Sequence, residues 1–321
     1  MRFITSIAAA LLLSTAAHAE TLQLYTSQSP EIAQQTVDAF QAKYPDIKVE
    51  WMRNGTSQLM NILRAEIEAG QIKPDLLLVA DTINLGSLKK EGLLLPYPQA
   101  AVGTFDEGTY DKDRTFFGTK LLTTAIAYNT KNAEPVKSWA DLLKPENDGQ
   151  IAVPSPLYSG AALNHLHAVI NDEAIGWDFY EGLAKLNIAP EGGNGPALKA
   201  VAGGMVKYGI IADADVIRAK AKGSPVDIVF PSEGVSFITE PVAIMKNSKN
   251  PEAAKKFVDF LLSQDGQKLV LEQGNLPLDP SLPVPEGFPK RSEIKLIPMD
   301  ADKAVENDQA VREKFTEIFG G

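Results

Sequence analysis

Three features of the sequence predict an α/β fold of two lobes, each a doubly wound mixed sheet flanked by helices. The chain has 321 residues, whereas a single domain usually takes roughly 100–200. Apolar runs of strand length alternate with segments of helical periodicity, which indicates parallel strands joined by helices. Hydrophobic residues make up 44% of the chain and charged residues 22%, which fits a folded protein with a sizeable core.

The segment "LQLYTSQSPEIAQQTVDAFQAKYPDIKVEWM" is the clearest β-α-β unit. Residues 22–25 form a predicted strand and residues 47–52 a second one. Between them, Ser29 can cap a helix, Pro30 suits its first position, and Glu31 favours its positive end. The apolar face of this helix comprises Ile32, Ala33, Val37 and Phe40.

The same alternation continues to the end of the chain. We expect helices at 54–70, in the first part of 82–97 before a turn, from about Ser159, and from Gly195 onward. A long helical region at 250–278 is expected to break at Gly266, and one more helix closes the chain. The expected strands cover 74–81, 119–130, 151–153, 207–213, 226–231 and 236–246.

The first 19 residues have the features of an export signal. Arg2 supplies a positive charge, residues 7–13 form a short apolar stretch, and Ala17-His18-Ala19 is a small-x-small cleavage site. We therefore expect residues 1–19 to be a signal peptide and the mature chain to begin at Glu20. The alternative is a buried N-terminal helix.

The composition limits where the protein can be located and which partners it can have. The net charge is −10 without a Lys/Arg-rich run, which argues against a nucleic-acid partner. The chain has no cysteine, which excludes thiol catalysis, disulfides and lipid attachment through an N-terminal Cys. An exported, acidic chain of this kind is expected in the periplasm.

Polar residues follow the expected strands, where open α/β sheets bind their ligands. They are Ser27, Ser29, Thr56, Ser57, Asp81, Ser159, Asn194, Asp213 and Asp215, with Gly160 beside Ser159. Each hydroxyl or acid could simply cap a helix. Several together, with free backbone N–H groups, could instead bind an anion such as a phosphate. Both interpretations stay open for each residue.

Catalytic signals are weak. The mature chain has two histidines, His165 and His167, which lie two positions apart on an expected helix and therefore point in different directions. We interpret them as structural and expect neither a metal nor a cofactor. A secreted hydrolase using the Asp213/Asp215 pair remains an alternative.

Several motifs together resemble the periplasmic solute-binding proteins of ABC importers, in the branch that contains ferric-ion binders and binders of sugar phosphates and phosphonates. The motifs are "LQLYTSQSPE", "PDLLLVAD", "YNT", "LPLDP" and "NPEAAKKFVDFLLSQDGQKLV". The last is similar to a family segment of the form N-x-x-x-A-x-x-F-x-x-F-L-x-S-x-x-G-Q. The resemblance covers essentially the whole mature chain and does not specify the ligand.

The resemblance implies two lobes joined by crossing strands, here 119–130 and 236–243, that close on a ligand by a hinge motion. Lobe 1 then covers 20–122, lobe 2 covers 123–235, residues 236–285 return to lobe 1, and 286–321 form a C-terminal helical segment. The resemblance also implies a binding protein and not an enzyme, a small-molecule ligand and an inner-membrane ABC permease as partner. We expect a monomer.

The departures from the ferric binders bear on the ligand. Their adjacent tyrosine pair falls at Ala214 and Asp215 of this chain, and their opening-loop histidine falls at Ser29. The sugar-phosphate and phosphonate binders of the same branch resemble this chain in having small or acidic residues there, so the resemblance implies a small phosphorylated or phosphonate organic solute, with Asp215 as a ligand contact. Glu240, on an expected crossing strand, is either a ligand contact or a hinge residue. The alternative is ferric iron or another cation, held by Asp81, Asp213, Asp215 and Glu240.

Overall fold

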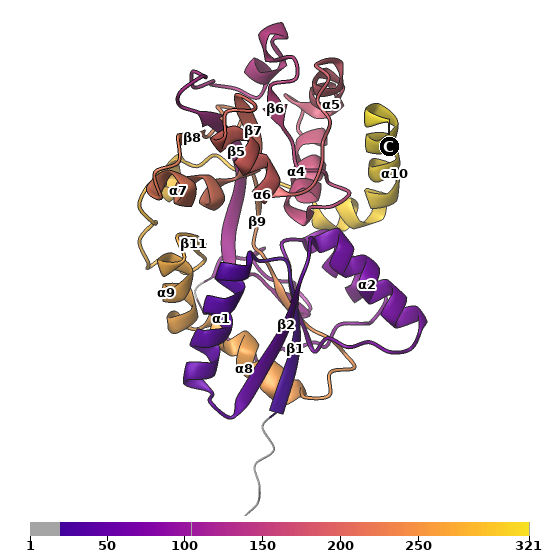
Figure 1. Cartoon of the computed structure of the whole chain (residues 1–321). Coiled ribbons are helices and arrows are strands. Elements are labelled where there is room, and N and C mark those ends of the chain that lie inside the picture. The colour runs from indigo at the N-terminus through magenta and orange to yellow at the C-terminus, as the bar shows by residue number, and fades with distance from the viewer. Residues whose placement is uncertain (1–19, 104, 321) are drawn as a thin grey trace, which may run out of the picture.

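The chain forms two α/β lobes, each built on its own sheet (Figure 1). The computed structural model describes residues 20–103 and 105–320, so the expected signal peptide lies outside the described residues. Within that part of the chain, no helix combines the length and apolar character needed to span a bilayer. The doubly wound α/β fold predicted from the sequence is confirmed.

Lobe 1 contains a five-stranded mixed sheet in the order β2-β1-β3-β10-β4. Strands β1, β2 and β3 run parallel, and β10 runs antiparallel to β3 and β4. The strands are β1 (Glu20–Thr26), β2 (Ile47–Arg53), β3 (Leu76–Leu78), β4 (Phe116–Phe117) and β10 (Val242–Ile244). The helices are α1 (Pro30–Lys43), α2 (Thr56–Glu68), α3 (Thr82–Lys90), α8 (Pro251–Leu262) and α9 (Gln264–Glu272).

Successive side chains of a strand point to opposite faces of this sheet. Helices cover both faces. Leu24 and Leu78 belong to a core that includes residues of α1 and α8. Their neighbours Tyr25 and Leu77 belong to a second core on the opposite face, with residues of α2 and α3. Burying both faces of a largely parallel sheet explains why β3 is a continuous apolar run.

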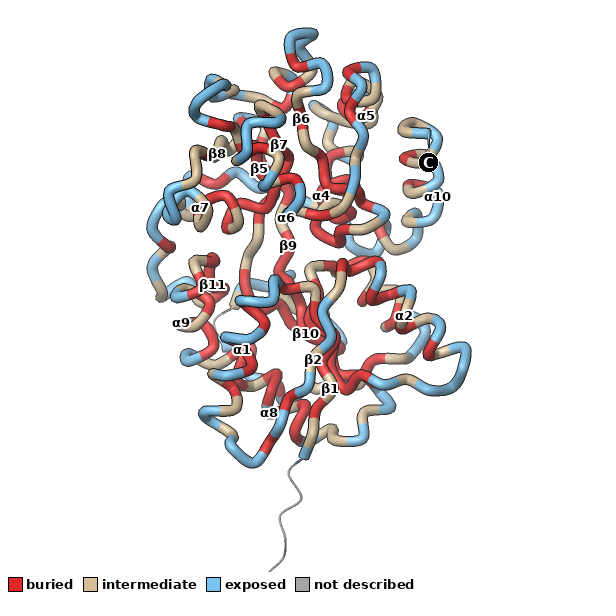
Figure 2. Tube along the Cα trace, in the orientation of Figure 1, coloured by how far each residue is buried: buried red, intermediate tan, exposed pale blue. Residues whose placement is uncertain are grey.

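Lobe 2 is organised around β5 (Lys120–Asn129), which pairs with several strands of the second sheet. The other strands are β6 (Ile151–Ala152), β7 (Tyr208–Ala212), β8 (Val226–Val229), β9 (Ser236–Ile238) and β11 (Leu276–Pro277). The helices are α4 (Gly160–Ile170), α5 (Gly176–Lys185), α6 (Asn194–Ala202), α7 (Asp213–Ala221) and α10 (Ala301–Phe319). Single 3-10 turns lie at Ala140–Leu143, Pro145–Asn147 and Arg291–Glu293. Figure 2 shows buried residues concentrated along the strands of both lobes.

Two chain segments cross between the lobes side by side. One lies between β4 and β5, and the other lies between β9 of the second sheet and β10 of the first. The backbone N–H of Thr119 donates to Thr239 O at 2.9 Å, and the hydroxyl of Thr119 donates to Glu240 O at 2.8 Å. These bonds tie the two crossings into one connection, at the positions where the sequence predicts crossing strands.

The C-terminal part of the chain differs from the sequence-based description in two respects. The break in the long helical region falls at Ser263 and not at Gly266, because Ser263 ends α8 and its side chain caps α9 by accepting from Gly266 N–H. Leu276 belongs to the lobe 2 core, so the chain re-enters lobe 2 near β11. The sequence predicts instead that residues 236–285, which include β11, belong to lobe 1. The other lobe boundaries stay predictions.

Helix α10 contacts both lobes. Its Phe315 packs in the lobe 2 core, with its ring centroid 5.8 Å from that of Tyr180 on α5. Its Ala304 is buried with Ile83 of α3 and Leu163 of α4, so helices of both lobes meet α10 at this junction. Figure 1 shows α10 alongside lobe 2, in yellow at the end of the chain.

Candidate ligand-binding site

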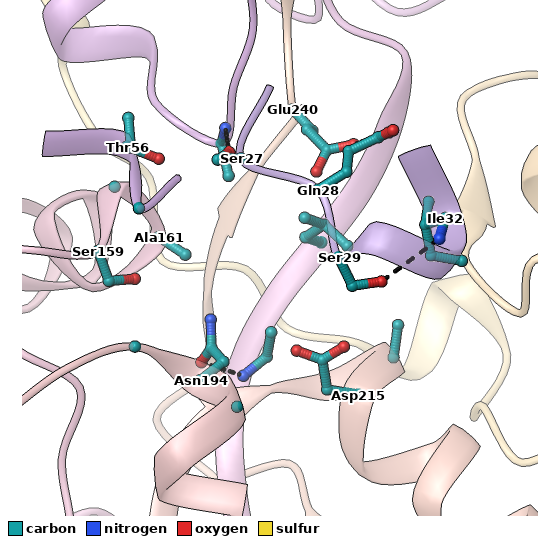
Figure 3. A pocket seen from close by; sticks show the side chains of 18 of the residues that line it. Ser27, Gln28, Ser29, Ile32, Thr56, Ser159, Ala161, Asn194, Asp215 and Glu240 are labelled. Carbon is teal, nitrogen blue, oxygen red and sulfur yellow. Dashed lines mark hydrogen bonds between the residues drawn. The ribbon is translucent and has the colours of Figure 1, made fainter. Parts of the chain in front are cut away.

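A cavity of about 480 Å³ lies between the lobes and beside their crossing segments. Small-molecule sites usually measure roughly 300–1,000 Å³, so the cavity suits a compact solute. Lobe 1 supplies residues that follow β1 and β2, and lobe 2 supplies the starts of α4, α6 and α7. In Figure 3, Ser29 of lobe 1 faces Asp215 and Asn194 of lobe 2 across the cavity.

Most of the residues proposed from the sequence line this cavity. They are Ser27, Ser29, Thr56, Ser159, Gly160, Asn194, Asp215 and Glu240. Ser57, Asp81 and Asp213 do not line it; all three are buried in neighbouring structure. The structure shows that these residues line the cavity. That each of them contacts the ligand stays a prediction.

Ser29 and Ser159 both act as helix caps and also face the cavity. The Ser29 hydroxyl accepts from Ile32 N–H at 3.5 Å, and the Ser159 hydroxyl accepts from Ala162 N–H at 3.3 Å. Helices α2 and α6 have Gly55 and Gly193 as their N-cap residues and therefore no side-chain cap. Capping and cavity lining are therefore compatible for the two serines, since each hydroxyl can also donate.

The N-termini of α2 and α4 meet across the cleft. The Ser57 N–H donates to Tyr158 O at 3.2 Å, and a Cβ built on Gly160 would lie 2.9 Å from Thr56 Oγ1. Within the described chain, the backbone N–H groups of Thr56, Gly160 and Ala161 have no protein acceptor, and all three residues line the cavity. Unpaired N–H groups at two helix starts provide a positive electrostatic environment.

Each acid in the cavity wall is paired with a base. The carboxylate of Asp215 accepts from Arg218, three residues later on α7. Glu240 Oε2 lies 2.5 Å from Lys120 Nζ and accepts from Gln28 Nε2 at 2.9 Å. Glu240 also has a φ of 39°, a left-handed conformation that few non-glycine residues adopt. Figure 3 shows the Glu240 carboxylate beside the side chain of Gln28 in the cavity wall.

Two of the three predicted residues outside the cavity, Asp213 and Asp81, have structural roles, whereas the buried hydroxyl of Ser57 has no hydrogen-bond partner among the described residues. Asp213 Oδ2 accepts from the N–H and the hydroxyl of Thr123, at 3.1 and 2.6 Å, so it joins α7 to β5. Burial raises the pKa of the Asp213 carboxyl to about 7, against the lowering effect of these bonds. Asp81 caps α3 by accepting from Ile83 and Asn84, and burial raises its pKa. Ser57 is buried in the first turn of α2.

The bases of the cavity were not among the site residues predicted from the sequence. Arg53, Lys120 and Arg218 line it, together with Gln28, Tyr158 and Asn275. Arg53 ends β2, so the strand-end rule that selected Ser27 could also have selected it. Arg218 lies one helical turn after Asp215, which is a readable pairing signal. Lys120 and Asn275 come from segments distant in the sequence and carried no such signal.

The two histidines are buried and lie apart. His165 Nδ1 is 2.9 Å from Ser236 Oγ, whereas His167 Nε2 is 3.1 Å from Asp308 Oδ1 on α10. Burial lowers the pKa of His165 to about 3, so its ring is neutral at physiological pH. Among the residues that the structure describes, no three His, Cys, Asp or Glu side chains cluster as metal ligands would. The four-acid iron site considered from the sequence is therefore not assembled, because Asp81 and Asp213 are engaged elsewhere.

Two α/β lobes, paired crossings and an interlobe cavity define a two-lobed solute-binding protein. The chain belongs to the bacterial extracellular solute-binding protein family, whose model matches residues 26–268. It therefore binds a small solute for an ABC permease and is not an enzyme, as the sequence predicted. The expected periplasmic location is confirmed by the family and by relatives named as periplasmic proteins.

The relatives differ in the solutes that their names state. The chain is 28% identical to an uncharacterised protein of Haemophilus influenzae Rd, covering 97% of this chain and 94% of that one. It is 29% identical to the spermidine/putrescine-binding periplasmic protein of Escherichia coli K12, over 63% of this chain and 62% of the relative. It is 26% identical to the major ferric iron-binding protein of Neisseria gonorrhoeae, over 95% of both chains.

Solved structures show the same fold. The periplasmic binding protein AfuA of Actinobacillus pleuropneumoniae, solved with fructose-6-phosphate, gives a TM-score of 0.85 at 22% identity, covering 94% of this chain and 99% of that one. The ferric binding protein of Campylobacter jejuni gives 0.79 at 24% identity, covering 92% and 99%. The fold is therefore common to proteins whose names and bound molecules indicate different ligands.

Proposed function

We propose that this protein binds a small phosphorylated or phosphonate organic solute in the interlobe cavity and delivers it to its permease. The observation that carries the proposal is the charge of the cavity wall. Three bases, Arg53, Lys120 and Arg218, line it against two acids, Asp215 and Glu240. Because both acids are already paired with Arg218 and Lys120, the cavity has a surplus of positive charge at Arg53.

The meeting of α2 and α4 supports the same proposal. Helix N-termini bind phosphate through backbone N–H groups and the helix dipole. The free N–H groups of Thr56, Gly160 and Ala161, with the hydroxyls of Thr56 and Ser159, would surround the oxyanion from both lobes. A phosphoryl group at this position would bridge the lobes and favour their closure.

The remaining wall suits the organic part of the solute. Asn194, Gln28, Asn275 and the two paired acids offer donors and acceptors for hydroxyl groups. The solved relative with bound fructose-6-phosphate shows that this fold accommodates a sugar phosphate. Ferric iron has less support, because the described residues assemble no cluster of metal-binding side chains. The monomeric state stays a prediction.

A thermal-shift screen followed by calorimetry tests the proposal. Glucose 6-phosphate, fructose 6-phosphate and simple alkylphosphonates are compared with glucose, putrescine, spermidine and ferric citrate. A ligand that binds the folded state alone raises the melting temperature by mass action. We expect stabilisation by at least one phosphorylated compound and none by its unphosphorylated parent. Stabilisation by ferric citrate or polyamines alone would overturn the proposal.

A further inference from the structure

We infer that Lys120 determines the sign of charge that the cavity accepts, because it occupies the position at Glu240 where a ligand ammonium would otherwise bind. The selection of anions rests on the proposed function, whereas the exclusion of amines can be measured without it. The consequence is a specificity against diamines and polyamines that one residue controls.

The Lys120–Glu240 pair is buried in the wall of the cavity. The two side chains are only 4% and 6% exposed, and both residues line the cavity. A buried carboxylate is costly unless it is paired, so the protein must supply a cation or the ligand must do so. Here the protein supplies it, with Nζ at 2.5 Å from Oε2.

The two lobe crossings fix the pair in place. Lys120 is the first residue of β5, and its N–H donates to Thr239 O at 3.2 Å on the other crossing. Glu240 is held by the Thr119 hydroxyl at its carbonyl and by Gln28 Nε2 at its carboxylate. A lysine tethered in this way acts as a permanent counter-ion, since dissociation would leave both charges buried.

An amine ligand would have to displace this lysine. A second ammonium beside Lys120 would place two like charges together in a poorly solvated site, which strongly disfavours binding. The other acid, Asp215, is paired with Arg218 in the same manner, although that pair is more exposed at 32% and 26%. Both carboxylates of the wall therefore already have a basic partner from the protein. This arrangement argues against amine binding, despite the likeness to spermidine/putrescine-binding relatives.

Three variants test the inference with putrescine and inorganic phosphate as probes in calorimetry. Lys120→Met keeps the length of the side chain and removes its charge. It should gain at least tenfold in putrescine affinity over wild type, in the range of a charge-assisted hydrogen bond. Glu240→Gln should gain no putrescine affinity and should bind inorganic phosphate more tightly. The double variant should bind putrescine no better than wild type.

Lys255→Met is the matched control, because Lys255 pairs with Glu252 on the outside of α8 and does not line the cavity. It should leave both affinities unchanged. A folded Lys120→Met protein without a gain for putrescine overturns the inference, and so does an equal gain in the double variant. If Lys120→Met does not fold, the phosphate affinity of Glu240→Gln tests the inference instead. Weaker binding of inorganic phosphate by Glu240→Gln than by wild type contradicts the inference.

The outcomes also separate the inference from the proposed function. If wild type binds no phosphorylated compound but Lys120→Met gains putrescine, the proposed solute class fails and the role of Lys120 stands. If wild type binds glucose 6-phosphate but Lys120→Met gains nothing, the solute class stands and the role of Lys120 fails. Tight binding of putrescine by wild type overturns both.

Discussion

Gly160 of lobe 2 lies directly against Asp81 of lobe 1. A Cβ built on Gly160 would lie 2.8 Å from Asp81 Cβ and 2.4 Å from Ala80 O, and neither neighbour can easily move. Asp81 is fully buried, and its carboxylate caps α3 through bonds of 2.9 Å from Ile83 N and Asn84 N. The close approach of the two lobes therefore requires a residue without a side chain at position 160.

We expect Gly160→Ala to weaken binding of the cognate solute about tenfold or more while the unfolding free energy changes little. The added methyl group would clash only when the lobes are together, so it reduces the fraction of closed molecules and raises the apparent Kd in proportion. Calorimetry gives the affinity, and small-angle scattering of the saturated protein should show a larger radius of gyration than wild type.

Gly195→Ala is the matched control for this prediction. Gly195 also lines the cavity near a helix start, but a Cβ there would meet nothing within 4 Å. It should bind as wild type does. Equal affinities for wild type, Gly160→Ala and Gly195→Ala would show that binding does not depend on this contact.

Asp215→Ala should weaken solute binding by roughly 1.5–3 kcal/mol, the range for hydrogen bonds to charged groups. The structure favours this expectation over helix capping, because among the described residues no backbone N–H donates to the Asp215 carboxylate. Its partly exposed pair with Arg218 should contribute only about 0–1 kcal/mol to folding. Calorimetry and thermal melts on one variant measure both quantities.

Asp227→Ala serves as the comparison, since Asp227 pairs with Lys220 at 2.7 Å and does not line the cavity. It should leave affinity unchanged. A stability loss of roughly 0.5–2 kcal/mol in Asp215→Ala, with affinity intact, would assign Asp215 to the helix instead.

The fold was predictable because its signals are local. Ser29, Pro30 and the helical spacing that follows them specify α1, and the apolar run at β3 reflects burial on both faces of the sheet. The position of the helix break was not predictable from Gly266 alone. A Cβ at Gly266 would lie 2.2 Å from Phe260 O, so this glycine allows close packing after the break rather than causing it.

The site was only partly predictable for a physical reason. The strand-end rule places a residue at the correct edge of a sheet, but it does not say which way the side chain points. Asp215 and Asp81 both follow strands, yet one faces the cavity while the other turns back to cap α3. The partner of Glu240 is Lys120, which is 120 positions earlier, so only the folded crossings bring the two together.

Asp213 should make stability depend on pH. Its pKa is about 7 in the folded protein and near 3.8 in the unfolded chain, so between these values only the folded state holds the proton. Its contribution is therefore fully present below about pH 3.8 and is lost as pH rises toward 7. The unfolding free energy of wild type minus that of Asp213→Asn should fall by about 1.4 kcal/mol per pH unit in this window. Urea titrations across the window measure it, and a constant difference would contradict the buried, protonated state.

His165 should act in the opposite direction. Its pKa is about 3 in the folded protein and near 6.5 in the unfolded chain, so the unfolded state binds the extra proton between these values. Stability from this group therefore rises with pH in that interval and offsets the effect of Asp213. We expect Asp213→Asn to show a clear rise in stability from pH 4 to 6, and Asp213→Asn/His165→Phe to show a smaller one. Equal pH slopes in the two variants would exclude a buried neutral His165.

Phe315→Ala should lower the unfolding free energy of lobe 2 by about 3–5 kcal/mol, the usual cost of truncating a buried phenylalanine. Phe315 is 2% exposed and packs with Tyr180 of α5 and with Phe319, at centroid distances of 5.8 and 4.7 Å. The exposed Glu317 lies on the same helix, so Glu317→Ala is the control and should change stability by less than about 0.5 kcal/mol. Urea unfolding gives both values. Because α10 shares a core with α5, its loss of packing should destabilise lobe 2 as a whole. If Phe315→Ala instead left the unfolding midpoint unchanged, α10 would be an accessory to the lobes and not part of the lobe 2 core.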